Sequence, residues 1–489
     1  MAITVKSVAV IGAGPAGAIA TDALVKEQAF DTIRVFDRRT VAGGVWVYTP
    51  HLPAKIPNLQ DIVEGKADPP VPIPAQLPTR TPISRTVNDH QVRYSDSPQH
   101  EYLHSNIIPS IMAYSKYPFP PTISDQIRER YGPAAPFRDR EIIREWIEDI
   151  FVQNGHDKLL ELGTTVEKAE KIQGKWVLTL RKEDKGKNYW WTEEFDALVV
   201  ASGHYNIPWI PEVEGLLDYD AKYPGRILHS KHFRDAKEFT GKKVIVVGAA
   251  VSSSEIIHEI IPYSKTPIIA SLRGPPIPAF GYVPWEHPHI EAKKQIVKFD
   301  PNNGRIHFAD GSHVNGVDHV IFGTGYTFSL PYLPHVQEKI RKEYRRLPGV
   351  YQHTWNIDDH TLTYVGMLGG GFTFPVYEWQ AVAIARHLAG RAKALPSQAE
   401  QTAWERKRAR ELVGGKNYYS IAPDYDEFFE FLRNIAGEPA EGTTGLKLRP
   451  FDKKWLELWA GMVAPKIESW VKSRKQAEDE IAGTIKAKL

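Results

Sequence analysis

The chain of 489 residues contains no cysteine. This absence excludes disulfide bonds, thiolate metal sites and a dithiol redox relay, and it is compatible with a reducing compartment. No apolar run is long enough to predict a membrane-spanning helix. The first residues also lack the basic start and apolar core of a secretory signal. We therefore expect a cytoplasmic protein without a membrane anchor, a disulfide bond or a metal site.

A large charge of one sign is also missing. The 61 lysine and arginine residues nearly balance the 59 aspartate and glutamate residues, which leaves a net charge of +2. This balance gives no electrostatic reason to expect nucleic acid or an anionic membrane as a partner. The hydrophobic fraction of 42% and the charged fraction of 25% are those of an ordinary globular protein, and the length predicts two or three domains.

A glycine-rich turn follows the first predicted strand. Residues 7–11 read as a buried parallel strand, and a helix of small residues comes after the turn. Gly12 permits the tight turn, Gly14 lets the backbone approach a pyrophosphate, and Gly17 lets the helix pack closely on the sheet. The free N–H groups at the start of the helix favour phosphate. The motif therefore predicts a dinucleotide-binding βαβ unit.

The predicted first cofactor site extends beyond these glycines. Pro15 and Ala16 open the helix. Asp37 stands at the end of the next predicted strand, where a carboxylate accepts hydrogen bonds from ribose hydroxyls and repels a 2′-phosphate. Gly44 and Trp46 follow in a paired-glycine turn that suits a flat ligand. These residues favour FAD or NAD over NADP.

A second, altered fingerprint lies half-way along the chain. Gly248 follows the apolar strand 243–247, but Ala250 and Ser253 stand where glycines are expected. The following strand ends in Arg273, whose guanidinium can hold a 2′-phosphate bidentately, which favours NADPH over NADH. The hydroxyl groups offered to phosphate belong to Ser252, Ser253 and Ser254. Two dinucleotide sites on one chain indicate electron transfer between a nicotinamide and a flavin.

Several further segments carry recognisable motifs. Residues 223–234 match the pattern F-x-G-x-x-x-H-x-x-x-F/Y, with Tyr223 in place of the leading Phe. Further elements are the G-G-x-W turn, the asparagine segment 105–109, the strand ends 199–204 and 322–326, and the closing segment 374–381. Together these segments resemble the flavin-containing monooxygenases, which are class B flavoproteins, and the serine-rich second fingerprint is more similar to fungal members.

The resemblance implies an α/β fold with two Rossmann-like domains. An FAD-binding domain would comprise residues 1–212 and 332–489, and an NADPH-binding domain, residues 213–331, would be inserted between them. NADPH would reduce FAD, and O₂ would then form a C4a-hydroperoxyflavin that oxygenates the nitrogen or sulfur of an amine, thioether or thiol. The partners would thus be a small nucleophilic substrate and O₂, and a homodimer is a family-level expectation.

The resemblance also assigns residues to the two cofactors. Asn106 would orient the reactive oxygen species or NADP⁺ by its amide, whereas His229 is interpreted as a residue that fixes a turn. On the FAD side the resemblance adds Ser202, Gly203 and Gln380. On the NADPH side it adds Arg234, Thr324, Gly325 and Tyr326. The aromatic residues expected to shape a substrate pocket are Tyr102, Phe280, Phe372 and Phe374.

Three alternatives stay open at this point. A Baeyer–Villiger monooxygenase acting on ketones would carry Trp where Phe233 ends the signature. An uncoupled NADPH oxidase would release H₂O₂, and a flavin-binding protein without turnover would consume no oxygen.

The proline-rich stretch 49–82 reads either as an extended covering loop or as a disordered insertion. A helix capped by Asp139 is expected to run to Phe151.

Overall fold

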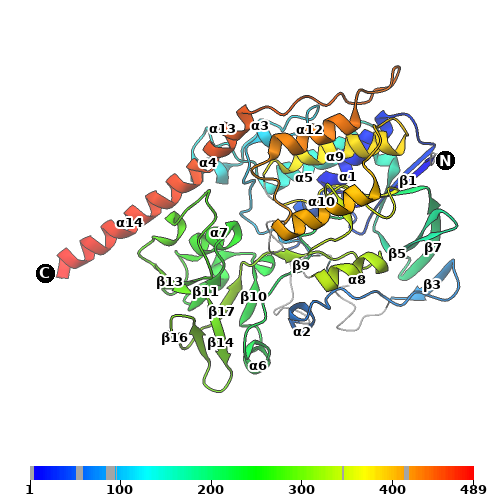
Figure 1. Cartoon of the computed structure of the whole chain (residues 1–489). Coiled ribbons are helices and arrows are strands. Elements are labelled where there is room, and N and C mark those ends of the chain that lie inside the picture. Colours follow the sequence, from blue (N-terminus) through cyan, green and yellow to red (C-terminus); the bar gives the residue numbers. More distant parts are fainter. Residues whose placement is uncertain are drawn as a thin grey trace.

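The structure of the protein is a computed structural model that describes residues 5–50, 59–83, 94, 96–343, 346–369, 371–411 and 418–488. The described residues form an α/β fold around two sheets with mainly parallel strands (Figure 1). We call the first sheet and its helix α1 (Pro15–Lys26) the first unit. The second sheet and its helix α7 (Val251–Ile260), green in Figure 1, are the second unit. The predicted fold class is confirmed.

The first sheet has seven strands in the order β19–β20–β21–β8–β1–β2–β4. Strands β21, β8, β1, β2 and β4 pair in parallel, and β19 and β20 add an antiparallel edge. The bounds are β1 (Ser7–Ile11), β2 (Thr32–Asp37), β4 (Leu160–Leu162), β8 (Ala197–Val200), β19 (Val350–Tyr351), β20 (Trp355–Asn356) and β21 (Leu362–Tyr364). The central strands β1 and β8 are apolar and buried because helices cover the sheet.

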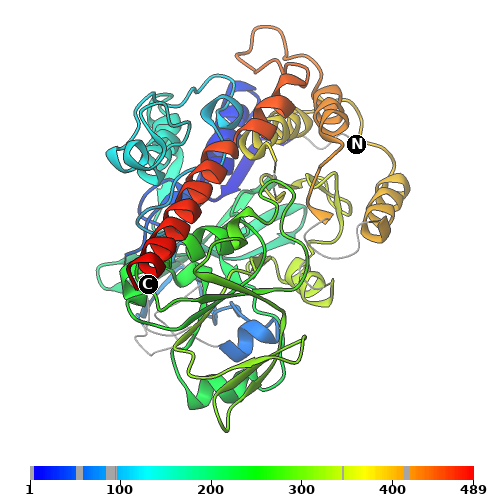
Figure 2. The ribbon, with the colours of Figure 1, turned by 90° about the vertical axis from the view of Figure 1, so that its left-hand side faces the viewer.

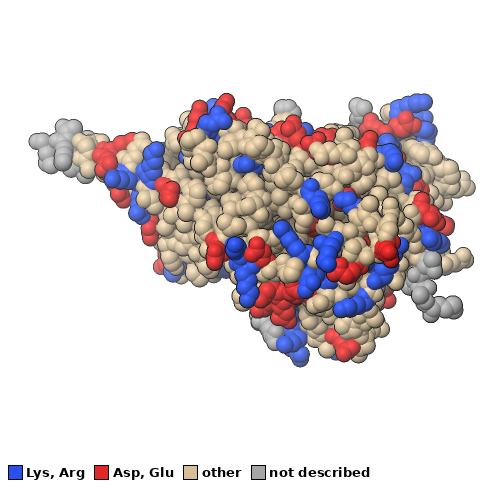
Figure 3. All heavy atoms as spheres, turned by 90° about the horizontal axis from the view of Figure 1, so that it is seen from above, with Lys and Arg blue, Asp and Glu red and all other residues tan. Residues whose placement is uncertain are grey.

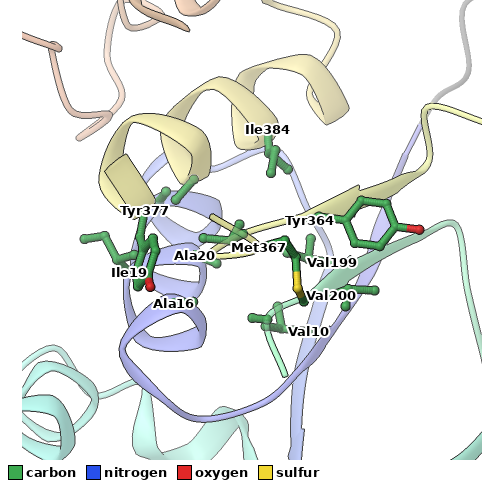
Figure 4. Packing of buried hydrophobic residues seen from close by; sticks show 14 of the residues in the cluster. Val10, Ala16, Ile19, Ala20, Val199, Val200, Tyr364, Met367, Tyr377 and Ile384 are labelled. Atoms are coloured by element: carbon green, nitrogen blue, oxygen red, sulfur yellow. The ribbon is translucent and has the colours of Figure 1, made fainter. Parts of the chain in front are cut away.

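Helix α1 packs beside α9 (Thr373–Leu388) over this sheet (Figure 4). Small residues on α1, such as Ala16 and Ala20, allow the close approach, and Ile384 of α9 points toward the same core. Val10 of β1 and Val199 of β8 complete this cluster from the strands below. The packing fixes the start of α1 relative to the carboxyl end of β1, where the first glycine turn lies.

The second sheet has five parallel strands in the order β10–β17–β11–β12–β13. Its strands are β10 (Ile227–His229), β11 (Val244–Val247), β12 (Ile268–Leu272), β13 (Ile290–Lys294) and β17 (His319–Phe322). All of them lie in sequence between β8 and β19 of the first sheet, so the second unit is inserted into the first. The predicted domain limits at 212/213 and 331/332 remain our proposal.

The chain crosses between the two units twice, and the two crossings pair with each other. Strand β9 (Ile207–Pro208) leaves the first unit, and β18 (Tyr326–Thr327) returns to it. The two strands are antiparallel, with Tyr326 opposite Pro208 and Thr327 opposite Ile207. This ribbon places the ends of strands β8 and β17 next to the same junction.

Two antiparallel sheets complete the described strands. Strands β3 (Thr79–Pro82), β7 (Lys187–Phe195), β6 (Lys175–Asp184) and β5 (Thr164–Ile172) form one sheet. Strands β14 (Ile296–Asp300), β15 (Arg305–Phe308) and β16 (His313–Val314) form the other. The other helices are α2 (Leu59–Val63), α3 (Pro109–Met112), α4 (Asp125–Tyr131), α5 (Arg140–Val152), α6 (Leu216–Lys222), α8 (Pro334–Glu343), α10 (Gln398–Glu411), α12 (Tyr425–Ala436), α13 (Lys454–Gly461) and α14 (Ala464–Lys488).

The interpretation of 49–82 as an extended loop is wrong in part. The stretch contains α2 and the edge strand β3, which pairs with β7, while residues 51–58 lie outside the described residues. Leu59 and Ile62 of α2 are buried in the core of the second unit. An edge strand tolerates proline, here Pro82, because one side of its backbone needs no ladder bond. The expected Asp139 cap of α5 is confirmed, since Asp139 accepts the N–H of Glu141.

The long helix α14 extends from the first unit across the second (Figures 1 and 2). It contacts α4 and the short helix η5 (Val283–Trp285) of the second unit. No helix among the described residues is long and apolar enough to cross a membrane. On the face seen in Figure 3, lysine and arginine are interspersed with aspartate and glutamate, in keeping with the small net charge.

Candidate cofactor and active site

The first glycine turn lies at the carboxyl end of β1. The N–H of Gly12 donates to the carbonyl of Phe36 at 2.8 Å, and φ of Gly12 is +111°, a conformation that favours glycine. A Cβ on Gly12 would lie 2.5 Å from the oxygen of Ala201. One on Gly17 would lie 1.8 Å from the oxygen of Gly12. Both glycines are therefore sterically required, and the turn presents the start of α1 as an anion site.

Asp37 holds this turn as well as facing it. Its carboxylate accepts the N–H of Ala13 at 2.7 Å and the N–H of Arg39 at 2.8 Å. The prediction placed only ribose hydroxyls at this carboxylate. Because an ionised carboxylate offers about four acceptor positions, two backbone bonds leave capacity for a ribose. Asp37 thus stabilises the loop conformation and keeps the predicted binding role available.

The paired-glycine turn lies directly against the glycine turn. Gly43 donates its N–H to the carbonyl of Ala13 at 2.9 Å. Gly44 approaches Gly14 so closely that a Cβ on Gly44 would lie 2.6 Å from the Cα of Gly14. The indole Nε1 of Trp46 is buried, with no hydrogen-bond partner among the described residues. A buried N–H of this kind is a donor that a bound polar ligand can satisfy.

The second glycine turn repeats the first. Gly248 donates its N–H to the carbonyl of Ser271 at 3.0 Å and has φ of +128°. A Cβ on Gly248 would lie 2.7 Å from the oxygen of Gly323. Helix α7 then begins at Val251. The altered fingerprint therefore forms a complete strand–turn–helix unit despite Ala250.

The three serines of α7 do not act alike. The hydroxyl of Ser253 donates to the carbonyl of Ala250 at 3.0 Å, and that of Ser254 donates to the carbonyl of Val251 at 2.8 Å. Both side chains are buried, whereas Ser252 is exposed. We therefore restrict the predicted hydroxyl contribution to phosphate binding to Ser252, because the other two hydroxyls bond within the helix.

Arg273 lies at the same edge of the sheet as the second turn. Val247 of β11 pairs with Ser271 of β12, so Gly248 and Arg273 follow at the same carboxyl edge. Arg273 is exposed. This placement leaves its guanidinium accessible to a phosphate bound near the turn, which is compatible with the predicted role.

Five predicted residues gather at the crossing between the units. Thr324 donates its hydroxyl to the carbonyl of Trp209, and the N–H of Trp209 donates to the carbonyl of Gly325 at 2.8 Å. Tyr326 belongs to the crossing strand β18. On the other strand end, Ser202 and Tyr332 share a hydrogen bond of 2.8 Å between their hydroxyls, and Gly203 follows with φ of +68°.

Gln380 is turned into the protein rather than toward a ligand. It is fully buried in α9, and its Oε1 accepts the N–H of Gly366 at 3.0 Å. Its Nε2 donates to the carbonyl of His353 and to the hydroxyl of Thr354, both at 3.1 Å. The amide joins two loops, so we remove Gln380 from the proposed cofactor contacts. Phe372 and Phe374, expected near a pocket, are also buried in the core.

Arg234 likewise has protein partners at every nitrogen. Its Nε donates to the carbonyl of Thr49 at 2.6 Å, and its Nη2 donates to that of Ser97 at 2.7 Å. Its Nη1 donates to the carbonyls of Lys231 and Phe233 at 2.9 and 2.8 Å. The guanidinium is buried and binds the segment around Ser97 to the second unit. This geometry replaces the predicted phosphate contact with a structural one.

The signature histidine fixes a turn, as interpreted from the sequence. His229 is fully buried, and its Nδ1 accepts the N–H of Lys231 at 3.1 Å. Burial holds the pKa of His229 well below its usual value, so the imidazole is neutral near pH 7. Burial also lowers the pKa of His100, near Asn106 in sequence, to about 3. These histidines therefore supply no cationic acid at neutral pH.

Asn106 lies between elements of both units. It is half-buried in the segment before α3, and its Oδ1 accepts a hydrogen bond from the ammonium of Lys466 on α14. The same ammonium pairs with the carboxylate of Glu255 on α7. The candidate amide is thus connected through Lys466 to the helix of the second glycine turn.

The model of the family "Flavin-binding monooxygenase-like" matches residues 101–278 and 287–440, which is more than half of the chain. The chain belongs to this family. It is an FAD-dependent monooxygenase that uses NADPH, as the sequence predicted.

Individual members of the family are similar over most of their length. A flavin-containing monooxygenase of Aspergillus flavus is 26% identical, with 92% of this chain and 95% of the relative covered. A trimethylamine monooxygenase of Methylocella silvestris is 27% identical, with 81% of this chain and 77% of the relative covered. The S-allyl-L-cysteine S-oxygenase from Allium sativum shares the fold with a TM-score of 0.72, 20% identity, and coverage of 99% and 100%.

Both cofactors of this flavin monooxygenase find suitable residues in the structure. The first unit offers a helix start, a close approach of two glycines and the buried indole N–H of Trp46, which has no partner in the part of the chain that the structure describes. The second unit offers the exposed Ser252 at the start of α7 and the exposed Arg273 beside it. The residues therefore fit two dinucleotides, one at each turn.

Sequence reasoning missed Lys466 altogether. The chain interval between Lys466 and Asn106 is 360 residues, and no motif connects them. The available signal was a lysine in the first turn after Pro465, where a helix usually carries an acidic residue. Further along the same helix, Lys472 is exposed.

Proposed function

We propose that this flavin monooxygenase transfers one oxygen atom of O₂ to the nitrogen or sulfur of a small amine, thioether or thiol. NADPH supplies a hydride and the medium supplies a proton. The second oxygen atom leaves as water, and NADP⁺ is the other product. FAD, when bound, carries the two electrons from NADPH and supplies the activated oxygen. A lone pair of the substrate heteroatom forms the new bond, so the protein needs no general base of its own.

The position of Asn106 at the junction of both units carries this proposal. Its amide is half-buried beside α7, and α7 begins at the second glycine turn. An amide in this position can donate a hydrogen bond to a reacting oxygen without introducing an acid. Keeping strong proton donors away favours oxygen transfer over release of H₂O₂, and the neutral His100, on the same segment as Asn106, adds no cationic acid there.

We assign FAD to the first unit and NADPH to the second. Asp37 next to the first turn would disfavour a 2′-phosphate and suits the ribose of FAD. Arg273 next to the second turn would bind the 2′-phosphate of NADPH. Trp46 and Gly44 would contact FAD, and Ser252 would contact the phosphates of NADPH.

The choice of nitrogen or sulfur as the acceptor is supported by related proteins. One relative of similar length is named a trimethylamine monooxygenase, and a protein with the same fold is an S-allyl-L-cysteine S-oxygenase. In addition, the histidine signature ends in Phe233, whereas the pattern expected of ketone-oxygenating enzymes ends in Trp. These observations favour soft nucleophiles over ketones.

The proposal is tested by rapid mixing. The purified yellow protein is reduced with NADPH without oxygen, and then mixed with oxygenated buffer containing trimethylamine, S-allyl-L-cysteine, cyclohexanone or no addition. We expect a lasting species whose absorbance differs from oxidised and reduced flavin, and its decay should accelerate with the amine or the thioether. Products are identified by mass, with one added oxygen. Acceleration by cyclohexanone alone, or stoichiometric H₂O₂ with every compound, would overturn the proposal.

A further inference from the structure

The C-terminal helix α14 delivers one charged residue to the active site. Lys466 lies in the first turn of α14, and its side chain is almost completely buried. Its ammonium reaches Asn106 of the first unit and Glu255 of the second unit. Three segments that are far apart in sequence therefore meet at one nitrogen atom.

A buried position at the start of a helix is energetically unfavourable for a lysine such as Lys466. Removing an ammonium from water costs several kcal/mol of free energy, which an ion pair repays only in part. The start of a helix also carries a partial positive charge, which repels a cation there. Burial lowers the pKa of Lys466, although Glu255 opposes this effect. Packing or helix stability alone would favour an uncharged residue at this position.

The neighbouring charges are arranged around the same helix α7. Glu259, one turn after Glu255, pairs with Arg130 of α4. Each carboxylate of α7 at this surface thus has its own cation, and Lys466 is paired with Glu255. A second hydrogen bond of the ammonium goes to the Asn106 amide, and its Nζ lies 5.5 Å from the ring centroid of Phe137.

Lys466 has a fixed position because α14 is docked along the second unit. One turn later, Trp470 stacks on His258 of α7, with ring centroids 5.1 Å apart. Further along, Arg474 pairs with Glu286 at 2.7 Å. The diagonal course of α14 over the second unit is visible in Figure 2. This docking restricts the ammonium to the position between Asn106 and Glu255.

The chemistry of lysine determines which way the amide faces. An ammonium has three donors and no acceptor, so only the carbonyl arm of Asn106 can bond to it. The NH₂ arm is then the one left to donate to a reacting oxygen or to a nicotinamide. Without Lys466 the amide could rotate by 180° and present its carbonyl oxygen instead.

We propose that Lys466 is a positioning residue that orients the Asn106 amide for the oxygen-transfer reaction. The inference rests on the proposed role of Asn106. It goes beyond that role by assigning a function to α14, which supplies the residue that makes Asn106 a donor. The ion pair with Glu255 links this orientation to the helix of the second glycine turn.

The test is a double-mutant cycle with Lys466→Met, Asn106→Ala and both together. The measured quantity is the rate constant for reoxidation of the NADPH-reduced protein by O₂, together with H₂O₂ formed per NADPH consumed. We expect Lys466→Met to change the rate constant on the order of ten-fold, and to have almost no further effect when Asn106 is already Ala. Lys472→Met, on the exposed part of α14, is the control and should match the wild type.

Two further observations separate this inference from its alternatives. Lys466→Arg retains donors toward the Asn106 carbonyl and should recover part of the wild-type rate. This variant keeps the inference testable if Lys466→Met binds FAD poorly. Additive effects in the cycle, or wild-type behaviour of Lys466→Met, would overturn the positioning role. If the wild type oxygenates no substrate, the proposed function fails, but the reoxidation rates of the same proteins still decide the cycle.

Discussion

Both units make the same glycine turn. In the first unit the small residue that lets the helix pack on the strand lies on the helix, whereas in the second unit it lies on the strand side. In the first unit, Gly17 lies on the helix, and a Cβ added there would be 3.8 Å from that of Ala201 on the strand side. In the second unit the helix carries Ser253, and the strand side carries Gly323, where an added Cβ would lie 2.9 Å from that of Ser253. One small residue is needed at each contact, and either partner can supply it.

The loops that cover the two turns are also equivalent. Gly43 donates to the carbonyl of Ala13 at 2.9 Å, and Ile277 donates to the carbonyl of Ala249 at 3.2 Å. In the first unit, however, Gly44 comes so close that its neighbour Gly14 has little space for a side chain. The second unit carries Ala250 at the position of Gly14. The altered fingerprint therefore reflects a different partner loop rather than a lost site.

The largest loss of stability is expected for a substitution of Gly17, because no neighbouring residue in the first unit can make room for a side chain there. In Gly17→Ala the new Cβ would lie 1.8 Å from the oxygen of Gly12, so the turn must move. We expect a loss of unfolding free energy of ~3 kcal/mol or more and little bound FAD. Thermal unfolding and the visible absorbance of the purified protein measure both effects. Gly461→Ala, in a helix with open space, is the control and should leave both almost unchanged.

A smaller effect with a specific rescue is expected in the second unit. Gly323→Ala would place its Cβ against Ser253, which should cost about 1–3 kcal/mol of unfolding free energy. Adding Ser253→Gly moves the small residue to the helix, as in the first unit, and should restore most of the stability. Chemical denaturation of the two single variants and the double variant measures the coupling. Strict additivity would contradict the compensation.

The features shared by both units could be predicted from the sequence because they are local. Buried apolar runs identified β1 and β11, and an Asp before a helical pattern identified the cap of α5. The family resemblance named Asn106 as a site residue, and its role there stays a prediction. These patterns depend on residues that are close in the chain, so backbone structure follows from them directly.

The contacts of long polar side chains could not be predicted in this way. Gln380 and Arg234 match family positions, but their partners are backbone and side-chain groups that only tertiary packing brings within reach. Lys466 has no local signal for its contact with Asn106. Helix α2 was missed because its buried residues Leu59 and Ile62 belong to the core of the other unit.

Asp37, the last residue of β2, provides a further difference between the two units that can be tested. In register, Asp37 corresponds to Leu272, so the second unit has no carboxylate at the position where Asp37 holds the first turn. Asp37→Ala leaves the buried N–H of Ala13 without its acceptor, which should cost about 1–3 kcal/mol of unfolding free energy and reduce FAD occupancy. Asp37→Asn retains one acceptor oxygen and should lose less. Unchanged flavin content in Asp37→Ala would remove Asp37 from the FAD site.

The smallest effect is expected for Arg273, whose substitution should change nucleotide binding by the second unit without disturbing the fold. Arg273 follows Leu272 at the edge of the second sheet and is exposed, so its removal should not alter unfolding. We expect Arg273→Ala to raise the KM for NADPH on the order of ten-fold, about 1.4 kcal/mol of binding free energy, and to leave the KM for NADH nearly unchanged. Arg305→Ala, an exposed arginine outside the five-stranded sheet, is the matched control. Equal losses for both nucleotides would mean that Arg273 acts on a feature they share and that another residue recognises the 2′-phosphate. A loss confined to NADPH would show that Arg273 sets the preference of the second unit for NADPH over NADH. Arg273 stands one position after Leu272, the residue that corresponds to Asp37 in the first unit.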